Sequence, residues 1–242
     1  MLPFIEIGAK QIDSAVFFLI AGTVIALTAY AVFGSRYGLK RYTALFSGVG
    51  LWIAEVLGAK LLYIAENFSY VSETGITFSG LSFFGIMFTV PLFSLLFAKL
   101  TRIPYGQFLD FAVTGILIQL VFYRIGCTLV GCCNGFECSW GIPGSDGLRY
   151  FPVQPIEAAL DFLLCVVLFV LYIKGKLRRG EQYLLYMAGY GTVRFILEFT
   201  RVRTVLFAGI SLSHIWAFLA VVVGASILFA RRVKAERETN SE

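Results

Sequence analysis

Two stretches of the sequence place cationic side chains in apolar surroundings. The stretch RIGCTLVGCCNG puts Arg124 among glycines and cysteines at the edge of an apolar run. The stretch GYGTVRFILEFTR spaces Tyr190, Arg194 and Glu198 four residues apart, so these side chains would share one face of a helix. A charged side chain at membrane depth costs about 2.5 to 3.5 kcal/mol even on lenient scales. Such arginines therefore indicate either buried ion pairs or the binding of an anion.

The embedded cations outnumber the acids near them, which favours binding of an anion. Lys60, Arg124 and Arg194 are the embedded cations, and Glu198 and Glu55 are the nearby acids. Glu55 is five residues from Lys60 and therefore lies on another face of the same helix. A pair between Arg194 and Glu198 alone would only hold a helix in place. The surplus of cations predicts an anionic ligand. The phosphate of a phospholipid is the anion that is always present at the surface of a membrane leaflet.

The composition determines which elements position these residues. Hydrophobic residues make up 58% of the 242 residues and charged residues 14%, which is too apolar for one soluble core. About seven runs reach the roughly 20 apolar residues that a spanning helix needs, and none alternates as a membrane strand would. The first run lacks the basic flank and cleavage site of a signal peptide, so we expect it to be retained. The runs start near Ser14, Tyr42, Thr77, Gln107, Pro155, Glu181 and Phe207.

The predicted fold class is therefore an all-α integral membrane protein with about seven transmembrane helices, in one polytopic domain over residues 1–242. Alternate connections, such as 174–179 and 231–237, carry most of the Lys and Arg and should face the cytoplasm. This orientation puts the N-terminus outside and the C-terminus inside. Residues from about 126 to 153 would form an extracytoplasmic loop, and residues from about 231 to 242 a short, partly disordered cytoplasmic tail. The net charge of +5 reflects this topology and does not indicate nucleic-acid binding.

The motifs and their order resemble the prolipoprotein diacylglyceryl transferases, a family of seven-helix bacterial inner-membrane enzymes. The resemblance implies transfer of the diacylglyceryl group of phosphatidylglycerol to the lipobox cysteine thiol of a prolipoprotein, forming a thioether and releasing glycerol phosphate. It also implies location in the bacterial inner (plasma) membrane, with no cofactor and no metal. It is carried by RIG and its loop at 124–135, QPIEA at 154–158 and YGTVRFILEF at 190–199, with echoes in GAKLLY at 58–63, LSFFG at 81–85 and LD at 109–110.

The resemblance also implies roles for matching residues. Arg124 and Arg194 would hold the phosphate and stabilise the charge that grows on it as the carbon–oxygen bond breaks. Tyr190 and Glu198 would orient Arg194 and the headgroup. Further substrate-binding residues are expected at Lys60, Gly126, Cys127, Cys132, Asn134, Gly135, Gln154, Glu157 and His214.

The sequence departs from the family pattern at several positions. Typical members have His-Gly-Gly where residues 84–86 read FGI, so a histidine proposed as general base is missing. A first-helix tyrosine is replaced within residues 13–17, and Cys127 and Cys132 stand where Asn and Glu are usual. Two alternatives therefore stay open, a phospholipid-dependent transferase with another acceptor and a non-catalytic lipid-binding or assembly protein on the same fold.

The loop cysteines and the single histidine each have more than one interpretation. A C-x4-C-C-x4-C pattern on an oxidising side favours one or two disulfides, whereas zinc is disfavoured because paired C-x2-C spacing is absent. The third interpretation is a thiol activated by Arg124 that takes up an acyl or glyceryl group. His214 is either a base or a hydrogen-bonded helix partner. Asp161, one turn after Glu157, is interpreted as an acid near a helix start. The pattern comprises Cys127, Cys132, Cys133 and Cys138.

Overall fold

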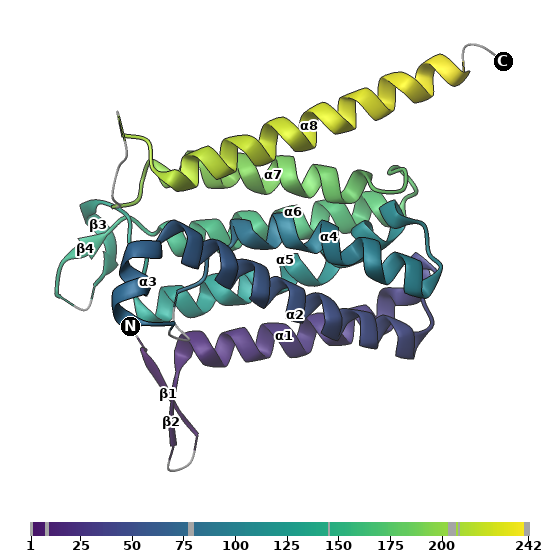
Figure 1. The fold of residues 1–242 in the computed structure, drawn as a ribbon. Helices are drawn as coiled ribbons and strands as arrows, with labels where there is room; N and C mark the ends of the chain where they lie inside the picture. Colours follow the sequence, from purple (N-terminus) through teal and green to yellow (C-terminus); the bar gives the residue numbers. More distant parts are fainter. Residues whose placement is uncertain are drawn as a thin grey trace.

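The computed structural model describes residues 2–7, 10–76, 80–144, 146–202, 207 and 209–239, and these form a bundle of long helices (Figure 1). Six of the described helices are long and apolar enough to cross a membrane, and α7, with three charged residues, is the seventh long helix. The predicted all-α membrane fold is thereby confirmed. The long helices are α1 Ser14–Phe33, α2 Arg41–Glu66, α4 Phe84–Thr101, α5 Tyr105–Val130, α6 Val153–Ile173, α7 Glu181–Glu198 and α8 Leu212–Thr239.

The strands and the short helix α3 (Phe68–Thr74) gather at one end of the bundle, which we call the hairpin end (Figure 1). Helix α8 ends at the opposite end, where the 3-10 turn η1 (Gly34–Tyr37) joins α1 to α2 (Figure 1). The apolar runs predicted helices alone, so the four strands were not predicted. The elements at the hairpin end are the antiparallel pair β1 Phe4–Ile7 and β2 Lys10–Asp13, the antiparallel pair β3 Glu137–Pro143 and β4 Arg149–Tyr150, and the short helix α3 Phe68–Thr74.

Helix α5 extends further toward the hairpin end than predicted. It continues through Val130, so Gly126 and Cys127 lie on the helix and the loop begins at Gly131. Gly131 ends the helix with φ 77°, and its N–H donates to the Cys127 carbonyl at 2.9 Å. This left-handed cap suits glycine, which carries no Cβ.

Helix α8 also differs from its predicted span. It begins at Leu212, after a predicted start near Phe207, and it continues through Thr239. The tail, which was predicted to be partly disordered, is therefore helical over residues 231–239. Its Arg, Lys and Glu residues favour helix, and Lys234 lies 3.9 Å from Glu238 one turn later. The predicted start near Thr77 falls outside the described residues, and α4 begins at Phe84.

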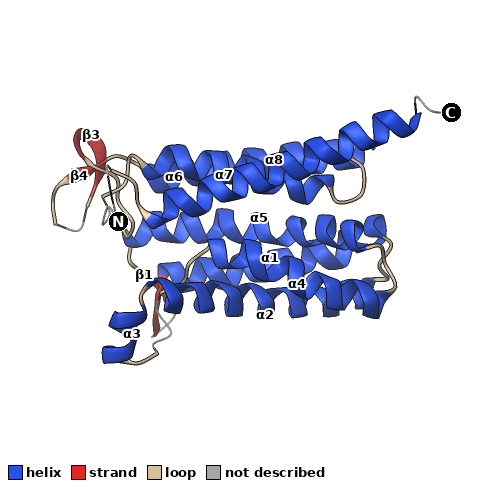
Figure 2. Cartoon of the chain, turned by 45° about the horizontal axis from the view of Figure 1, so that its top comes forward, coloured by secondary structure: helices blue, strands red, loops and turns tan. Residues whose placement is uncertain are grey.

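Helix α5 occupies the centre of the bundle, between α1, α2 and α4 on one side and α6, α7 and α8 on the other (Figure 2). Residues 108–117 of α5 are all buried, as expected for a helix with neighbours on several sides. Gly126 allows α1 to approach closely, because a Cβ there would lie 2.8 Å from the Ala15 Cα. Large apolar side chains such as Leu92, Phe162 and Phe229 are exposed on the outside, which suits contact with lipid.

Candidate functional site

Three arginines converge on Glu157 at the hairpin end of α6. Arg124 Nη2 of α5 lies 2.9 Å from Glu157 Oε1, and Arg194 Nη1 of α7 lies 3.2 Å from Oε2. Arg201, which follows α7, also pairs with Oε2 of Glu157. All four residues are buried. A buried charge must be paired, so Glu157 ties α5, α6 and α7 together at this point.

Glu198 forms the second centre of this charged cluster. The predicted pair with Arg194 is present, with 2.9 Å between Arg194 Nη2 and Glu198 Oε2. Arg201 Nε lies 3.8 Å from the same oxygen, and Ser211 Oγ donates to Glu198 Oε1 at 3.0 Å. Three guanidinium groups therefore face two carboxylates in these pairs. The cluster retains the cationic surplus that the sequence predicted, with a different third cation.

Arg201 was not among the predicted site residues. It lies in the connection after α7, yet its side chain is buried in the cluster. Its spacing of three residues from Glu198 was the available signal, because i,i+3 residues are neighbours on a helix. Lys60, the predicted third cation, instead donates to the Gly80 carbonyl at 3.2 Å and lies 5.0 Å from the Tyr63 ring centroid.

His214 joins the cluster through Ser211. The Ser211 N–H donates to His214 Nδ1 at 3.0 Å, so Nδ1 is the acceptor nitrogen and the proton of a neutral ring lies on Nε2. The ring packs against Phe199, with 4.3 Å between centroids. Nε2 is buried and has no hydrogen-bond partner among the described residues. This placement fits the hydrogen-bonded helix partner of the two interpretations.

Tyr190 is fully buried, one turn before Arg194. Its ring packs on Phe83 and Phe84, with centroids 4.8 and 6.1 Å apart. Its hydroxyl has no hydrogen-bond partner in the described part of the chain. Any orientation of Arg194 by Tyr190 therefore does not act through a hydrogen bond in this structure.

A cavity of about 510 Å³ lies beside the cluster at the hairpin end. Arg124 and Arg194 both line it, so each guanidinium is held by Glu157 and also borders open space. Tyr63 and Gly80, the two contacts of Lys60, line it as well. The volume is in the range of small-molecule sites. Guanidinium groups present planar arrays of N–H donors that suit phosphate.

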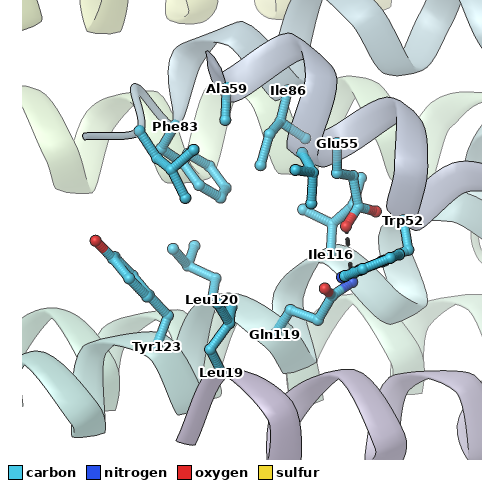
Figure 3. A pocket seen from close by; sticks show the side chains of 12 residues that line it. Leu19, Trp52, Glu55, Ala59, Phe83, Ile86, Ile116, Gln119, Leu120 and Tyr123 are labelled. Atoms are coloured by element: carbon cyan, nitrogen blue, oxygen red, sulfur yellow. Dashed lines mark hydrogen bonds between the residues drawn. The ribbon is translucent and has the colours of Figure 1, made fainter. Parts of the chain in front are cut away.

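A narrower apolar pocket of about 80 Å³ borders this cavity (Figure 3). Leu19, Leu81, Phe83 and Tyr123 line both spaces. At the other end of the pocket, Gln119 Nε2 donates to Glu55 at 2.7 Å (Figure 3). Cations thus line one part of the combined space and apolar side chains line another. This distribution suits a ligand with an anionic head and an apolar tail.

The loop after α5 is fastened to α6 by Gln154. Its Nε2 donates to the Cys132 carbonyl at 2.5 Å and to Asn134 Oδ1 at 2.9 Å. Gly135 pairs with Arg201 in an isolated β-bridge, and a Cβ at Gly135 would lie 2.8 Å from the Phe151 carbonyl oxygen. These residues, which were predicted to bind substrate, thus fix the loop against α6 and against Arg201.

The predicted disulfides are absent, because none of the five cysteines is bonded to another. Cys127 is buried on α5, and Cys132 Sγ donates to its carbonyl at 3.9 Å. The neighbouring thiols of Cys127 and Cys133, together with burial, raise the pKa of Cys132. Cys132 therefore does not fit the third interpretation, a thiol activated by Arg124. Cys133 lines the cavity with a backbone φ of 61°. No His, Cys, Asp and Glu group within the described residues is arranged to hold a metal ion.

The fold and the site define a multi-pass α-helical membrane protein in which paired, buried arginines border an amphipathic cavity. The family model for prolipoprotein diacylglyceryl transferase matches residues 3–230, so the chain belongs to this family. The resemblance inferred from the motifs is thereby confirmed.

Curated relatives agree with the family model. A phosphatidylglycerol–prolipoprotein diacylglyceryl transferase of Dehalococcoides mccartyi (strain CBDB1) is 29% identical over 232 residues, covering 90% of this chain and 88% of the relative. The protein of that name from Tropheryma whipplei (strain TW08/27) is 28% identical over 249 residues, covering 93% and 90%. The transferase numbered 2 of Clostridium perfringens (strain 13 / Type A) is 25% identical over 252 residues, covering 98% of each chain.

Proposed function

We propose that this protein transfers the diacylglyceryl group of phosphatidylglycerol to the lipobox cysteine thiol of a prolipoprotein in the bacterial inner membrane. The products are a thioether-linked lipoprotein precursor and glycerol phosphate. The observation that carries the proposal is the position of Arg124 and Arg194, which come from two helices and line one cavity while Glu157 pairs with both.

The two arginines suit the bond that must break. Attack by sulfur on the diacylglyceryl methylene carbon breaks a carbon–oxygen bond, and the electron pair leaves with the phosphate oxygen. Guanidinium groups beside that oxygen stabilise the growing charge most where water is excluded. Glu157 fixes both guanidinium groups before the lipid arrives, so little reorganisation is needed when the bond breaks.

The shape of the combined space suits a phospholipid. The arginines border the large cavity, where the headgroup phosphate binds, and the apolar pocket beside it accepts part of an acyl chain. The positive-inside prediction places the hairpin end outside the cytoplasm. A prolipoprotein whose lipobox cysteine lies at the outer face of the membrane then reaches the cavity from that end.

The acceptor cysteine attacks directly in this proposal. The enzyme has its own thiol at the cavity, Cys133, and a two-step transfer through that thiol would first form a thioether on the enzyme. A thiolate is a far poorer leaving group from carbon than a phosphate ester, so the diacylglyceryl group would remain on Cys133. The carbon–oxygen bond is cleaved by displacement, which requires neither a metal nor an organic cofactor.

The test combines purified protein, labelled phosphatidylglycerol and a lipobox peptide, with mass spectrometry of the peptide. We expect a mass increase of one diacylglyceryl group on the cysteine, lost in Arg194→Gln. Arg41→Gln is the matched control, since Arg41 is an exposed arginine at the start of α2 and should not affect transfer.

Two other outcomes would contradict the proposal. Binding of phosphatidylglycerol without any product would support a non-catalytic lipid-binding protein. Release of glycerol phosphate without a thioether on the peptide would support a lipid-cleaving enzyme with another acceptor.

A further inference from the structure

The acceptor thiol must lose its proton before or during attack. A free cysteine has a pKa near 8.5, so only a few per cent of it is thiolate at neutral pH, and the thiolate is the nucleophile. A general base placed beside the thiol contributes about 10²- to 10⁴-fold to the rate. The inference below rests on the proposed function. Few groups in the structure could act as this general base.

We infer that Glu66 is the general base that takes the proton of the acceptor thiol. Glu66 is the last residue of α2, at the hairpin end, and it lines the same cavity as Arg124 and Arg194. It is the only carboxylate among the described residues that line this cavity. The base and the phosphate-binding arginines therefore border one space.

The other acids of the site are occupied. Glu157 pairs with three arginines, and Glu198 accepts from Arg194 and Ser211. Neither lines the cavity in the described structure. His214 is also excluded as the base, because its Nδ1 already accepts from the Ser211 N–H and its ring is covered by Phe199. Phe84 lines the cavity at the position where the family resemblance implied a histidine.

Glu66 is held by a contact from another helix. Trp216 Nε1 of α8 donates to Glu66 Oε1 at 2.8 Å, and the indole packs edge-on against Phe88 of α4 at 5.4 Å between centroids. An indole N–H can only donate, so it engages one carboxylate oxygen and leaves the other for a substrate proton. The helix dipole disfavours an acid at this C-terminal position. Helix stability therefore does not explain why a glutamate occupies it.

The step balances without any further reactant. The carboxylate of Glu66 takes the thiol proton, the sulfur electron pair forms the carbon–sulfur bond, and the carbon–oxygen electron pair leaves on glycerol phosphate between Arg124 and Arg194. The carboxylic acid then returns its proton to the departing phosphate or to water in the cavity. Glu66 is regenerated for the next turnover.

Several other charged or titratable groups face the same space and must be separated from Glu66. The groups that line it are Tyr63 of α2, Tyr123 and Arg124 of α5, Cys133 of the loop and Arg194 of α7. Lys60 of α2 contacts the ring of Tyr63. All of them are retained in a Glu66 variant. The ratio of variant rate to wild-type rate at each pH therefore isolates the effect of the one carboxylate.

The experiment measures the peptide transfer reaction from pH 6 to pH 9.5 for wild type, Glu66→Gln and Glu66→Asp. We expect Glu66→Gln to lower kcat about 10²-fold at pH 7 with an unchanged KM for phosphatidylglycerol. The deficit should shrink above about pH 8.5, where the acceptor thiol ionises without help. A selenocysteine peptide, whose selenol is already ionised at neutral pH, should restore the rate of Glu66→Gln. Glu66→Asp should recover part of the activity, and Glu73→Gln, an exposed acid of α3, should match wild type.

Three results would overturn the inference. A full rate for Glu66→Gln at pH 7 would show that Glu66 is not the base. A deficit that is equal at every pH and persists with the selenocysteine peptide would assign Glu66 a structural role. Failure of the wild-type protein to form any thioether would overturn the proposed function as well, which distinguishes the two failures.

Discussion

Two buried acids at opposite ends of the bundle are satisfied in different ways. Asp110 of α5 accepts the backbone N–H of Gly180 at 2.6 Å and of Tyr183 at 3.1 Å, and this fixes the start of α7 against α5. Glu157 of α6 is paired instead with the side chains of Arg124, Arg194 and Arg201. Each backbone N–H has one hydrogen to donate, and at Gly180 and Tyr183 it is used on Asp110, so Asp110 serves the fold. A guanidinium group paired with a carboxylate still has further N–H donors. Two of the guanidinium groups at Glu157, those of Arg124 and Arg194, also line a cavity.

The largest effect should follow from removing the charge of Glu157. Glu157→Gln leaves Arg124 and Arg201 without their main buried counter-ion, and breaking a buried pair in this way costs about 3 to 5 kcal/mol. We expect a loss of that size in the free energy of unfolding, measured by denaturant titration in detergent micelles, together with loss of transfer. Glu137→Gln, an exposed acid of β3, serves as the control. A stability equal to wild type would show that Glu157 does not organise the arginines.

Arg124→Lys tests the chemistry of the cluster while keeping its charge. Lysine presents a point charge in place of the planar fork, so it cannot hold Glu157 and a phosphate oxygen with the same geometry. We expect kcat/KM for transfer to fall about 10²-fold, comparable to loss of one donor to a developing oxyanion. Arg149→Lys on the exposed strand β4 should leave the rate unchanged. An unchanged rate in Arg124→Lys would mean that charge alone suffices.

Asp110→Asn should affect the fold and leave the chemistry intact. An asparagine retains one oxygen acceptor and turns an N–H₂ group toward the other backbone donor, and an unsatisfied buried donor costs about 1 to 3 kcal/mol. We expect a decrease of that order in the free energy of unfolding, with kcat per folded molecule unchanged. A fall in kcat without a change in stability would place Asp110 in the reaction and remove the contrast with Glu157.

The sequence predicted those features that depend on local spacing. Apolar runs identified the spanning helices, and the four-residue spacing of Arg194 and Glu198 identified an ion pair that measures 2.9 Å in the structure. Both follow from the helical repeat, which operates within one element. Arg124 was identified because placing a cation next to an apolar run in the membrane has a high free-energy cost, which indicates a function.

Features that depend on contacts between elements were not predictable in this way. Glu157 was assigned to substrate binding by resemblance, and its pairing with arginines of three segments depends on how α5, α6 and α7 pack. The pair between Arg201 and Glu157 depends on the same packing, whereas the spacing of Arg201 from Glu198 was visible in the sequence. The loop cysteines suggested disulfides by spacing alone, but α5 extends through Val130 and places Cys127 on a buried helix. Spacing along the chain does not reveal that α5 continues past Cys127.

The smallest effect should come from Asp161, which lies one turn from Glu157 on the same helix. Both acids are buried, but neither oxygen of Asp161 has a hydrogen-bond partner among the described residues. Asp161→Asn keeps the shape and removes no hydrogen bond, so we expect the free energy of unfolding to change by less than about 1 kcal/mol in the same micelle titration. A loss as large as that of Glu157→Gln would show that Asp161 supplies a necessary negative charge. Asp161 would then balance the third arginine, and the cationic surplus that we assign to the lipid phosphate would be lost.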